Sequence, residues 1–185
     1  MTRLGSGRVA LVGLSILLGA LATSICEGQP QAPLVLRVKA AFVYYFALFV
    51  DWPGSTLGPG QSKVVLGVWG NDALGQTLGG LRGKRVGDRT LEVVQFEANQ
   101  DVSACHLLYV AASEPAKVRE LLGKLEGQPI LTVSDRPGFL GLGGMIQFFI
   151  EGETVRFQIS RSRASAAGLK LSSKLLQAAK LVDLD

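Results

Sequence analysis

One apolar and aromatic stretch stands out in the sequence: Val38-Lys39-Ala40-Ala41-Phe42-Val43-Tyr44-Tyr45-Phe46-Ala47-Leu48-Phe49-Val50-Asp51-Trp52-Pro53. At helical spacing it carries two neighbouring apolar stripes: Val38, Phe42, Tyr45, Phe49 and Trp52 on one, and Ala40, Val43, Ala47 and Val50 on the other. We predict a helix that Pro53 ends, because a proline disfavours helical geometry in the residue before it. A helix that is apolar on most of its circumference is buried or bound to something. Its main expected role is core packing, and its second is contact with a partner.

The N-terminus has the three parts of a secretory signal peptide. Arg3 and Arg8 precede an apolar run at 9–22, which is short for a membrane anchor, and small and polar residues follow at 23–28. A lipid anchor on Cys26 is not expected, because the residue before it is not small. The segments that we predict are a signal peptide over 1–26 with cleavage between 22 and 28, a linker over 27–35 and a single domain over 36–185.

The charge balance argues against one class of partner. The chain has 185 residues, with 19 Lys and Arg and 15 Asp and Glu. Loss of Arg3 and Arg8 with the signal peptide leaves 17 basic residues (19 minus 2) against 15 acidic ones, a net charge of +2. Nucleic-acid binding needs a concentrated basic face. The one local cluster of Arg and Lys, at 161–174, is explained by a solvated helix face, so no nucleic-acid partner is expected.

Beyond the first helix, strand and helix patterns alternate along the chain. The strands that we predict are 64–70, 90–96, 106–111, 129–133, 145–151 and 155–160. The helices that we predict are 71–78, 113–125, a segment from 161 to Gly168, and 172–182. Several strands are continuously apolar, which is typical of parallel strands buried on both faces. The fold class expected is therefore α/β, a layered single domain with a largely parallel central sheet, flanking helices and an antiparallel C-terminal hairpin.

Residues with catalytic potential are scarce. His106 is the single histidine, and it follows Cys105 at the start of a predicted strand, where neighbours point to opposite faces. A Cys-His nucleophile pair is therefore not expected, the two residues are too few for structural zinc, and no G-x-S-x-G motif is present. Cys105 is either buried and inert or available for an intermolecular disulfide with a redox role. We assign no catalytic residue, cofactor or metal, and expect a binding or regulatory protein before an enzyme.

Loops after two predicted strands are candidates for ligand binding. Gly70, Asn71 and Asp72 follow one strand, and Asp135 and Gly138 follow another. Open α/β sheets bind ligands at such strand ends. The first loop lacks the Lys and Ser/Thr of a Walker loop and the G-x-G-x-x-G spacing, so a tight turn is the alternative reading.

Four blocks of sequence together resemble the YfiR-like periplasmic family over about residues 36–182. The blocks are Val38-Lys39-Ala40-Ala41-Phe42 through Trp52-Pro53; Gly67-Val68-Trp69-Gly70-Asn71-Asp72 with Gly75; Thr132-Val133-Ser134-Asp135-Arg136-Pro137-Gly138-Phe139 leading to Gly143-Gly144-Met145-Ile146; and Val155-Arg156-Phe157-Gln158-Ile159 leading to Ala167-Gly168-Leu169-Lys170-Leu171-Ser172-Ser173-Lys174-Leu175-Leu176. The first and last blocks are the more specific ones.

The resemblance implies a periplasmic regulator that is not an enzyme. Such proteins bind and restrain the periplasmic sensor region of a membrane signalling protein, a diguanylate cyclase or a sensor kinase, and so hold down cyclic di-GMP and biofilm formation. In the best-understood kind, disulfides link release to envelope redox state. This sequence departs from that pattern, because Cys105 has no evident partner in the mature chain.

Three hypotheses follow. In the first, the chain is a periplasmic inhibitor, and candidate contacts with the partner or with a second copy in a homodimer are Lys39, Tyr44, Asp51 and Trp52. In the second, it is a periplasmic small-ligand-binding module that uses the loops near Gly70 and Gly138. The third is an envelope hydrolase that acts through His106 or a carboxylate pair.

Overall fold

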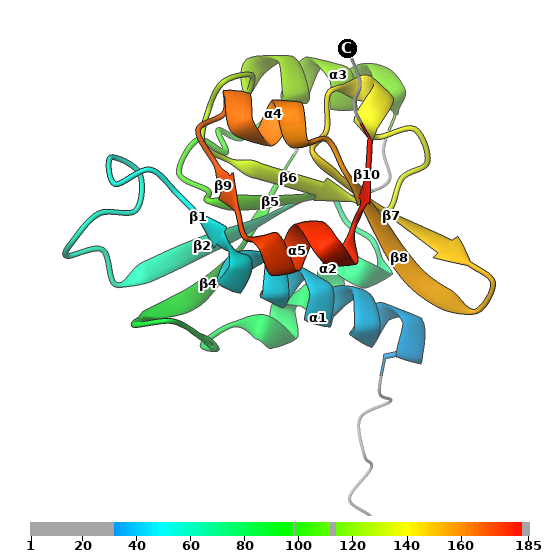
Figure 1. The fold of residues 1–185 in the computed structure, drawn as a ribbon, viewed down its shortest axis with the longest axis horizontal. Helices are drawn as coiled ribbons and strands as arrows, with labels where there is room; N and C mark the ends of the chain where they lie inside the picture. The colour runs from blue at the N-terminus through cyan, green and yellow to red at the C-terminus, as the bar shows by residue number, and fades with distance from the viewer. Residues whose placement is uncertain (1–31, 98, 112–113, 183–185) are drawn as a thin grey trace, which may run out of the picture. The chain divides into compact units, whose positions relative to one another are not determined.

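The computed structural model describes residues 32–97, 99–111 and 114–182 (Figure 1). The predicted signal peptide, Cys26 and residues 27–31 of the predicted linker lie outside this part of the chain. Within it, none of the helices has the length and apolar character that a membrane span needs.

Helix α1 (Leu34–Phe49) begins two residues before the predicted domain start at residue 36. Of its two apolar stripes, the one with smaller side chains is fully buried: Ala40, Val43, Ala47 and, just after the helix, Val50. Phe46 joins them in the core. The aromatic stripe is divided, because Phe42 and Phe49 are half-buried while Tyr45 is 48% exposed. The helix therefore has one buried face, and its opposite face is exposed although it also carries apolar side chains.

The end of α1 differs from the prediction. The helix stops at Phe49, and Val50–Asp51 form a short strand, β1, that pairs antiparallel with β9 (Lys170–Leu171). Extended backbone thus replaces the last helical turn before Pro53. Trp52 lies outside the helix with its side chain 9% exposed, so its assignment to the helical stripe was wrong. The cause is a pairing partner more than a hundred positions away, which the local pattern does not contain.

The predicted fold class is confirmed. One sheet contains eight strands in the order β10-β8-β7-β6-β5-β2-β4-β3, and β1 with β9 forms a separate antiparallel pair. The strands of the large sheet are β2 (Lys63–Trp69), β3 (Arg85–Val86), β4 (Arg89–Phe96), β5 (Leu107–Val110), β6 (Leu131–Ser134), β7 (Ile146–Glu151), β8 (Thr154–Ile159) and β10 (Lys180–Leu181). β4, β2, β5, β6 and β7 are mutually parallel neighbours, and β7–β8 is the expected antiparallel hairpin.

The C-terminal elements are only partly as predicted. α4 (Arg161–Ala166) is followed by β9, and α5 (Ser173–Ala178) is capped by Ser172, whose hydroxyl accepts from the backbone N–H of Leu175. The predicted helix over 172–182 is wrong beyond Ala178, because β10 leaves it to pair with β8 in parallel. Short strands such as β3 and β10 exist only through their sheet neighbours, so local sequence does not mark them.

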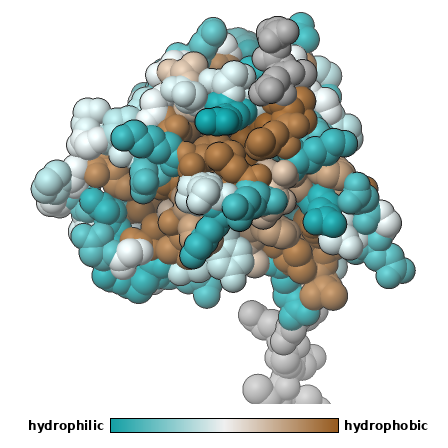
Figure 2. Space-filling view, in the orientation of Figure 1, coloured by the Kyte–Doolittle hydropathy of each residue, from teal (hydrophilic) through white to brown (hydrophobic). Residues whose placement is uncertain are grey.

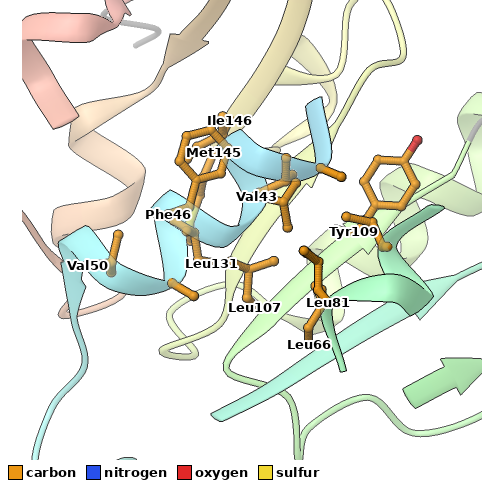
Figure 3. Close-up of a cluster of buried hydrophobic side chains, with 14 of the residues drawn as sticks. Val43, Phe46, Val50, Leu66, Leu81, Leu107, Tyr109, Leu131, Met145 and Ile146 are labelled. Atoms are coloured by element: carbon orange, nitrogen blue, oxygen red, sulfur yellow. The ribbon is translucent and has the colours of Figure 1, made fainter. Parts of the chain in front are cut away.

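Helices cover both faces of the sheet. Figure 1 shows α1, α2 (Ala73–Leu78) and α5 on one side, and α3 (Pro115–Lys124) and α4 on the other. The side chains of β5 alternate between two apolar clusters: Leu107 and Tyr109 pack with α1 and α2, while Leu108 and Val110 pack with α3. Figure 3 shows the first cluster, with Phe46 of α1 above the strands. The sheet is thus buried on both faces, as its apolar runs predict.

Candidate functional site

Polar side chains meet at the carboxyl ends of the parallel strands. The strand order reverses between β2 and β5, because β2 leads to β4 on one side and β5 leads to β6 on the other. Ligands of open α/β sheets bind at such a point. Asp72 follows β2, Tyr109 lies on β5, Asp135 follows β6, and Lys39 reaches the same place from α1. We name these four residues the carboxyl-edge cluster.

All four carboxylate oxygens of the carboxyl-edge cluster have a partner. The Tyr109 hydroxyl donates to Asp72 Oδ2 at 2.8 Å and lies 3.2 Å from Asp135 Oδ1. Lys39 Nζ donates to Asp135 Oδ2 at 3.0 Å, and the backbone N–H of Gly75 donates to Asp72 Oδ1 at 2.6 Å, which caps α2. The cluster therefore ties α1, α2, β5 and the loop after β6 together.

Tyr109 keeps its proton in this environment. Its side chain is fully buried, and Figure 3 shows its hydroxyl pointing away from the apolar cluster. Burial raises the pKa of Tyr109 far above its ordinary value, and the negative charges of Asp135 and Asp72 raise it further. A phenol that stays protonated is a hydrogen-bond donor and neither a nucleophile nor a base. The hydrogen bonds of the carboxyl-edge cluster thus hold α1 in position against the sheet.

The sequence-predicted ligand loops are only partly brought together. Asp72 and Asp135 share Tyr109. The Gly70 carbonyl accepts from the Gln95 side chain, and Asn71 Oδ1 accepts from Gln76 Nε2 at 3.3 Å. These two hydrogen bonds stabilise the turn between β2 and α2 and do not reach the carboxyl-edge cluster. Gly138 has a φ of 77° with open space around it. Ligand binding by these loops stays a prediction. Tyr109 was missed, since a tyrosine inside the run Leu107-Leu108-Tyr109-Val110 is typical of a core strand.

The outward face of α1 is the second notable feature. Its apolar side chains repeat at i, i+7, i+11 and i+14: Leu34, Ala41, Tyr45 and Leu48, all exposed. Leu34 is 67% exposed and Leu48 37%. Figure 2 shows hydrophobic residues at the N-terminal end of α1. We name these four residues the α1 stripe. The spacing from Leu34 was the sequence signal for it.

The four predicted partner contacts lie elsewhere. Lys39 is engaged with Asp135, and its side chain is 12% exposed. The Tyr44 hydroxyl donates to the carbonyl of Arg85 at 2.6 Å. Trp52 is buried and donates through Nε1 to the His106 carbonyl at 2.9 Å. Asp51 is the exposed one of the four. Three of these side chains therefore hold α1 and β1 in place within the domain.

Comparison with known proteins identifies the family of the chain. A family model described as YfiR/HmsC-like matches residues 36–180. The chain belongs to the YfiR/HmsC-like family. This family is regulatory rather than catalytic, and it is periplasmic. A search of curated proteins finds no match. In this YfiR/HmsC-like chain the match begins within α1 and ends in β10, so it includes the whole carboxyl-edge cluster and every residue of the α1 stripe except Leu34.

The single histidine of this YfiR/HmsC-like domain has structural contacts on both ring nitrogens. The backbone N–H of Val65 donates to His106 Nδ1 at 3.0 Å, and Nε2 lies 3.3 Å from the Thr56 carbonyl oxygen. This pattern assigns the neutral tautomer with the proton on Nε2. His106 therefore joins the loop after Pro53 to β2 and β5, and this geometry does not support the hydrolase hypothesis that relies on its imidazole.

Cys105 lies on the other side of the strand start, with its side chain 2% exposed. Burial, and secondarily the charge of Asp101, raises the pKa of the Cys105 thiol to about 12. A cysteine in this state is a poor nucleophile. It is the free cysteine of the described residues, and Cys26 lies outside them. A redox role for Cys105 would need the strand to open.

We predict that His106 makes the stability of the domain depend on pH below about 6.5. Burial lowers the pKa of His106 below its usual 6.5, and the charge of Arg89 adds to this. The unfolded state then binds the proton first as pH falls, so the free energy of unfolding falls too, by at most about 1.4 kcal/mol per pH unit. Urea unfolding of the mature chain at several pH values measures this slope. His106→Asn should flatten it, and an unchanged slope in that variant would contradict the assignment.

Proposed function

We propose that this protein is a periplasmic, non-enzymatic regulator that binds and restrains the periplasmic sensor region of a membrane signalling protein. The partner class that fits the family is a membrane-bound diguanylate cyclase, so the output would be a lower level of cyclic di-GMP and less biofilm. Membership of the YfiR/HmsC-like family supports the regulatory role. The predicted signal peptide over 1–26 supports the location.

The observation that carries a binding function is the α1 stripe. Leu34, Tyr45 and Leu48 are large apolar side chains that the domain leaves in water, although α1 has a complete inner face for the core. Apolar surface that is exposed along one helix face is typical of protein interaction sites. Tyrosine is among the residues that contribute most to binding energy at interfaces. We therefore propose the α1 stripe as the contact surface for the partner.

The carboxyl-edge cluster supports this role by fixing α1. Lys39 and Asp135 connect the N-terminal half of the helix to β6, and the Tyr44 hydroxyl connects its middle to β3. A helix held at several points loses little conformational freedom when a partner binds. Less of the interaction energy is then spent on ordering the surface.

The decisive experiment uses a double variant, Tyr45→Glu with Leu48→Glu. Two carboxylates on the α1 stripe should weaken binding to the periplasmic region of the cognate cyclase by at least about tenfold, because their desolvation has no compensating partner. In cells without the wild-type gene, the wild-type copy should lower cyclic di-GMP and the double variant should not. Calorimetry with the purified sensor region and nucleotide extraction from the cells give the two measurements.

Ile150→Glu is the matched control. Ile150 is 52% exposed at the end of the β7–β8 hairpin, so it has the same apolar character on another surface. It should bind and complement as the wild type does. If Ile150→Glu abolishes binding and the α1 variant does not, the contact lies on the hairpin.

If deletion of the gene leaves cyclic di-GMP unchanged, the regulatory proposal itself fails. Light scattering of each variant reports whether the α1 stripe instead pairs two copies of the chain.

A further inference from the structure

A hollow of about 260 Å³ lies between α3, the short turn η2 (Leu140–Leu142) and α4, on the side of the sheet away from α1. Its walls are mainly aliphatic: Leu122, Leu125, Leu142, Met145 and Ala166. Gly143 closes one end of η2 with a φ of 113°, and a Cβ there would lie 3.5 Å from Leu122. The turn therefore sits directly on α3, which shapes the hollow.

One guanidinium group is positioned at this hollow. Arg163 comes from α4, is half-buried, and donates through Nη1 to the carbonyl oxygens of Leu140 and Gly144, the latter at 3.3 Å. Among the described residues, Nε and Nη2 of Arg163 have no hydrogen-bond acceptor, and no carboxylate pairs with this side chain. Both groups retain access to solvent, since neither is a buried unsatisfied atom. The guanidinium group is thus held in place through Nη1, and its Nε and Nη2 donors remain available beside the aliphatic side chains that line the hollow.

The charge at the rim favours an anion. Arg119 of α3 also lines the hollow, and Glu126 is the one carboxylate among the lining residues. Two guanidinium groups and one acidic side chain therefore line this space. The acidic residues Glu114 and Glu120 of the same helix region are paired with Lys117 and Lys124 instead. The rim carries a net positive charge beside apolar walls, which is the combination that an amphipathic anion requires.

We propose that this hollow binds a small aliphatic carboxylic acid. The carboxylate would accept two parallel hydrogen bonds from Nε and Nη2 of Arg163, a geometry that guanidinium and carboxylate groups share. The hydrocarbon chain would lie against Leu142, Met145 and Ala166. The site is separate from the α1 stripe, and it does not depend on the proposed partner.

Size and lining select this class of ligand. The volume corresponds to roughly nine water molecules at about 30 Å³ each, which is below the range of drug-sized pockets. A volume of this size accommodates one short hydrocarbon chain. No aromatic side chain lines the hollow, so stacking with a ring is not provided. An aliphatic body with one acidic head therefore matches both the walls and the rim.

The test uses the full mature chain with hexanoate as the probe and 1-hexanol as the uncharged probe of the same chain length. Two-dimensional amide NMR locates binding, and calorimetry measures the affinity. Hexanoate should move the amide signals of Leu142 and Gly143, and hexanol should bind at least about tenfold more weakly because it lacks the charge that Arg163 recognises. Equal affinities for the two probes, or shifts confined to another part of the domain, would overturn the proposal.

Three variants separate recognition from folding. Arg163→Gln should reduce hexanoate affinity at least about tenfold. Arg161→Gln is the matched control, an exposed arginine of the same helix that does not line the hollow, and it should bind as the wild type does. Because Arg163 also holds η2, Ala166→Phe provides a second route: Ala166 lines the hollow at an exposed position, so a larger side chain there should compete for the space without removing Arg163. Unchanged hexanoate binding by a folded Ala166→Phe or Arg163→Gln variant would refute the site.

Discussion

Replacing Phe46 with alanine is expected to lower the free energy of unfolding of the domain by about 3–5 kcal/mol. The Phe46 ring is fully buried, and it lies 5.0 Å from the ring of Phe157 and 5.8 Å from that of Phe148, measured between centroids. These rings belong to the β7–β8 hairpin, so the substitution opens a cavity between α1 and the C-terminal half of the sheet. Since whole domains are stable by about 5–15 kcal/mol, this loss is a large fraction of the total.

Tyr45→Ala is the control for that experiment. Tyr45 directly precedes Phe46 in α1 and is of similar size, but it belongs to the exposed α1 stripe. Its substitution should change the free energy of unfolding by about 0.5 kcal/mol or less. Urea denaturation of both variants at neutral pH gives the comparison. Equal losses for the two variants would mean that the inner and outer faces of α1 have been assigned incorrectly.

Tyr109→Phe is expected to cost about 1–3 kcal/mol, although it removes only one oxygen atom. The hydroxyl is the donor that Asp72 and Asp135 share, and its loss leaves two partly buried carboxylate oxygens without that partner. Tyr44→Phe is the matched control, because the Tyr44 hydroxyl makes one exposed hydrogen bond to a backbone carbonyl. It should cost no more than about 1 kcal/mol. Denaturant unfolding measures both.

A double-mutant cycle of Tyr109→Phe with Lys39→Met tests whether the carboxyl-edge cluster acts as a unit. Both residues contact Asp135, so their effects should couple by about 0.5–3 kcal/mol. Strict additivity would show that α1 is held by its apolar face alone. The same variants connect stability to function, because Lys39→Met should loosen the N-terminal half of the helix that carries the proposed contact surface.

Most of the fold was accessible from the sequence because its signals are local. β2 and β5 are continuous apolar runs, the hairpin alternates in burial, and Asp72 and Ser172 are recognisable caps. What failed depended on distant partners. The helix was extended to Trp52 because nothing near Val50 indicates β9, and β10 was read as helix because its pairing with β8 is long-range.

The site was predictable in part, for the same reason. Asp72 and Asp135 follow parallel strands, so a common edge could be expected for both. Lys39 was assigned to the outer face of α1, although its side chain turns inward to a carboxylate 96 positions later in the chain. The α1 stripe was overlooked because the larger aromatic residues beside it dominate the pattern. A helix that is apolar on both faces gives no local indication of which face the sheet will cover.

The pairing of α1 with the last strands has a consequence for the order of events during synthesis. α1 is the first described element to be synthesised, yet Phe46 packs on Phe148 and Phe157. The ion pair of Lys39 likewise forms only after Asp135 has been synthesised. Contacts this far apart close large chain loops, which slows folding relative to a chain of local contacts. Until β7 and β8 are made, Phe46 lacks its two aromatic partners on the sheet, so part of the inner face of α1 stays uncovered and prone to aggregation. We expect the nascent chain to need a chaperone to protect this helix until the C-terminal third arrives.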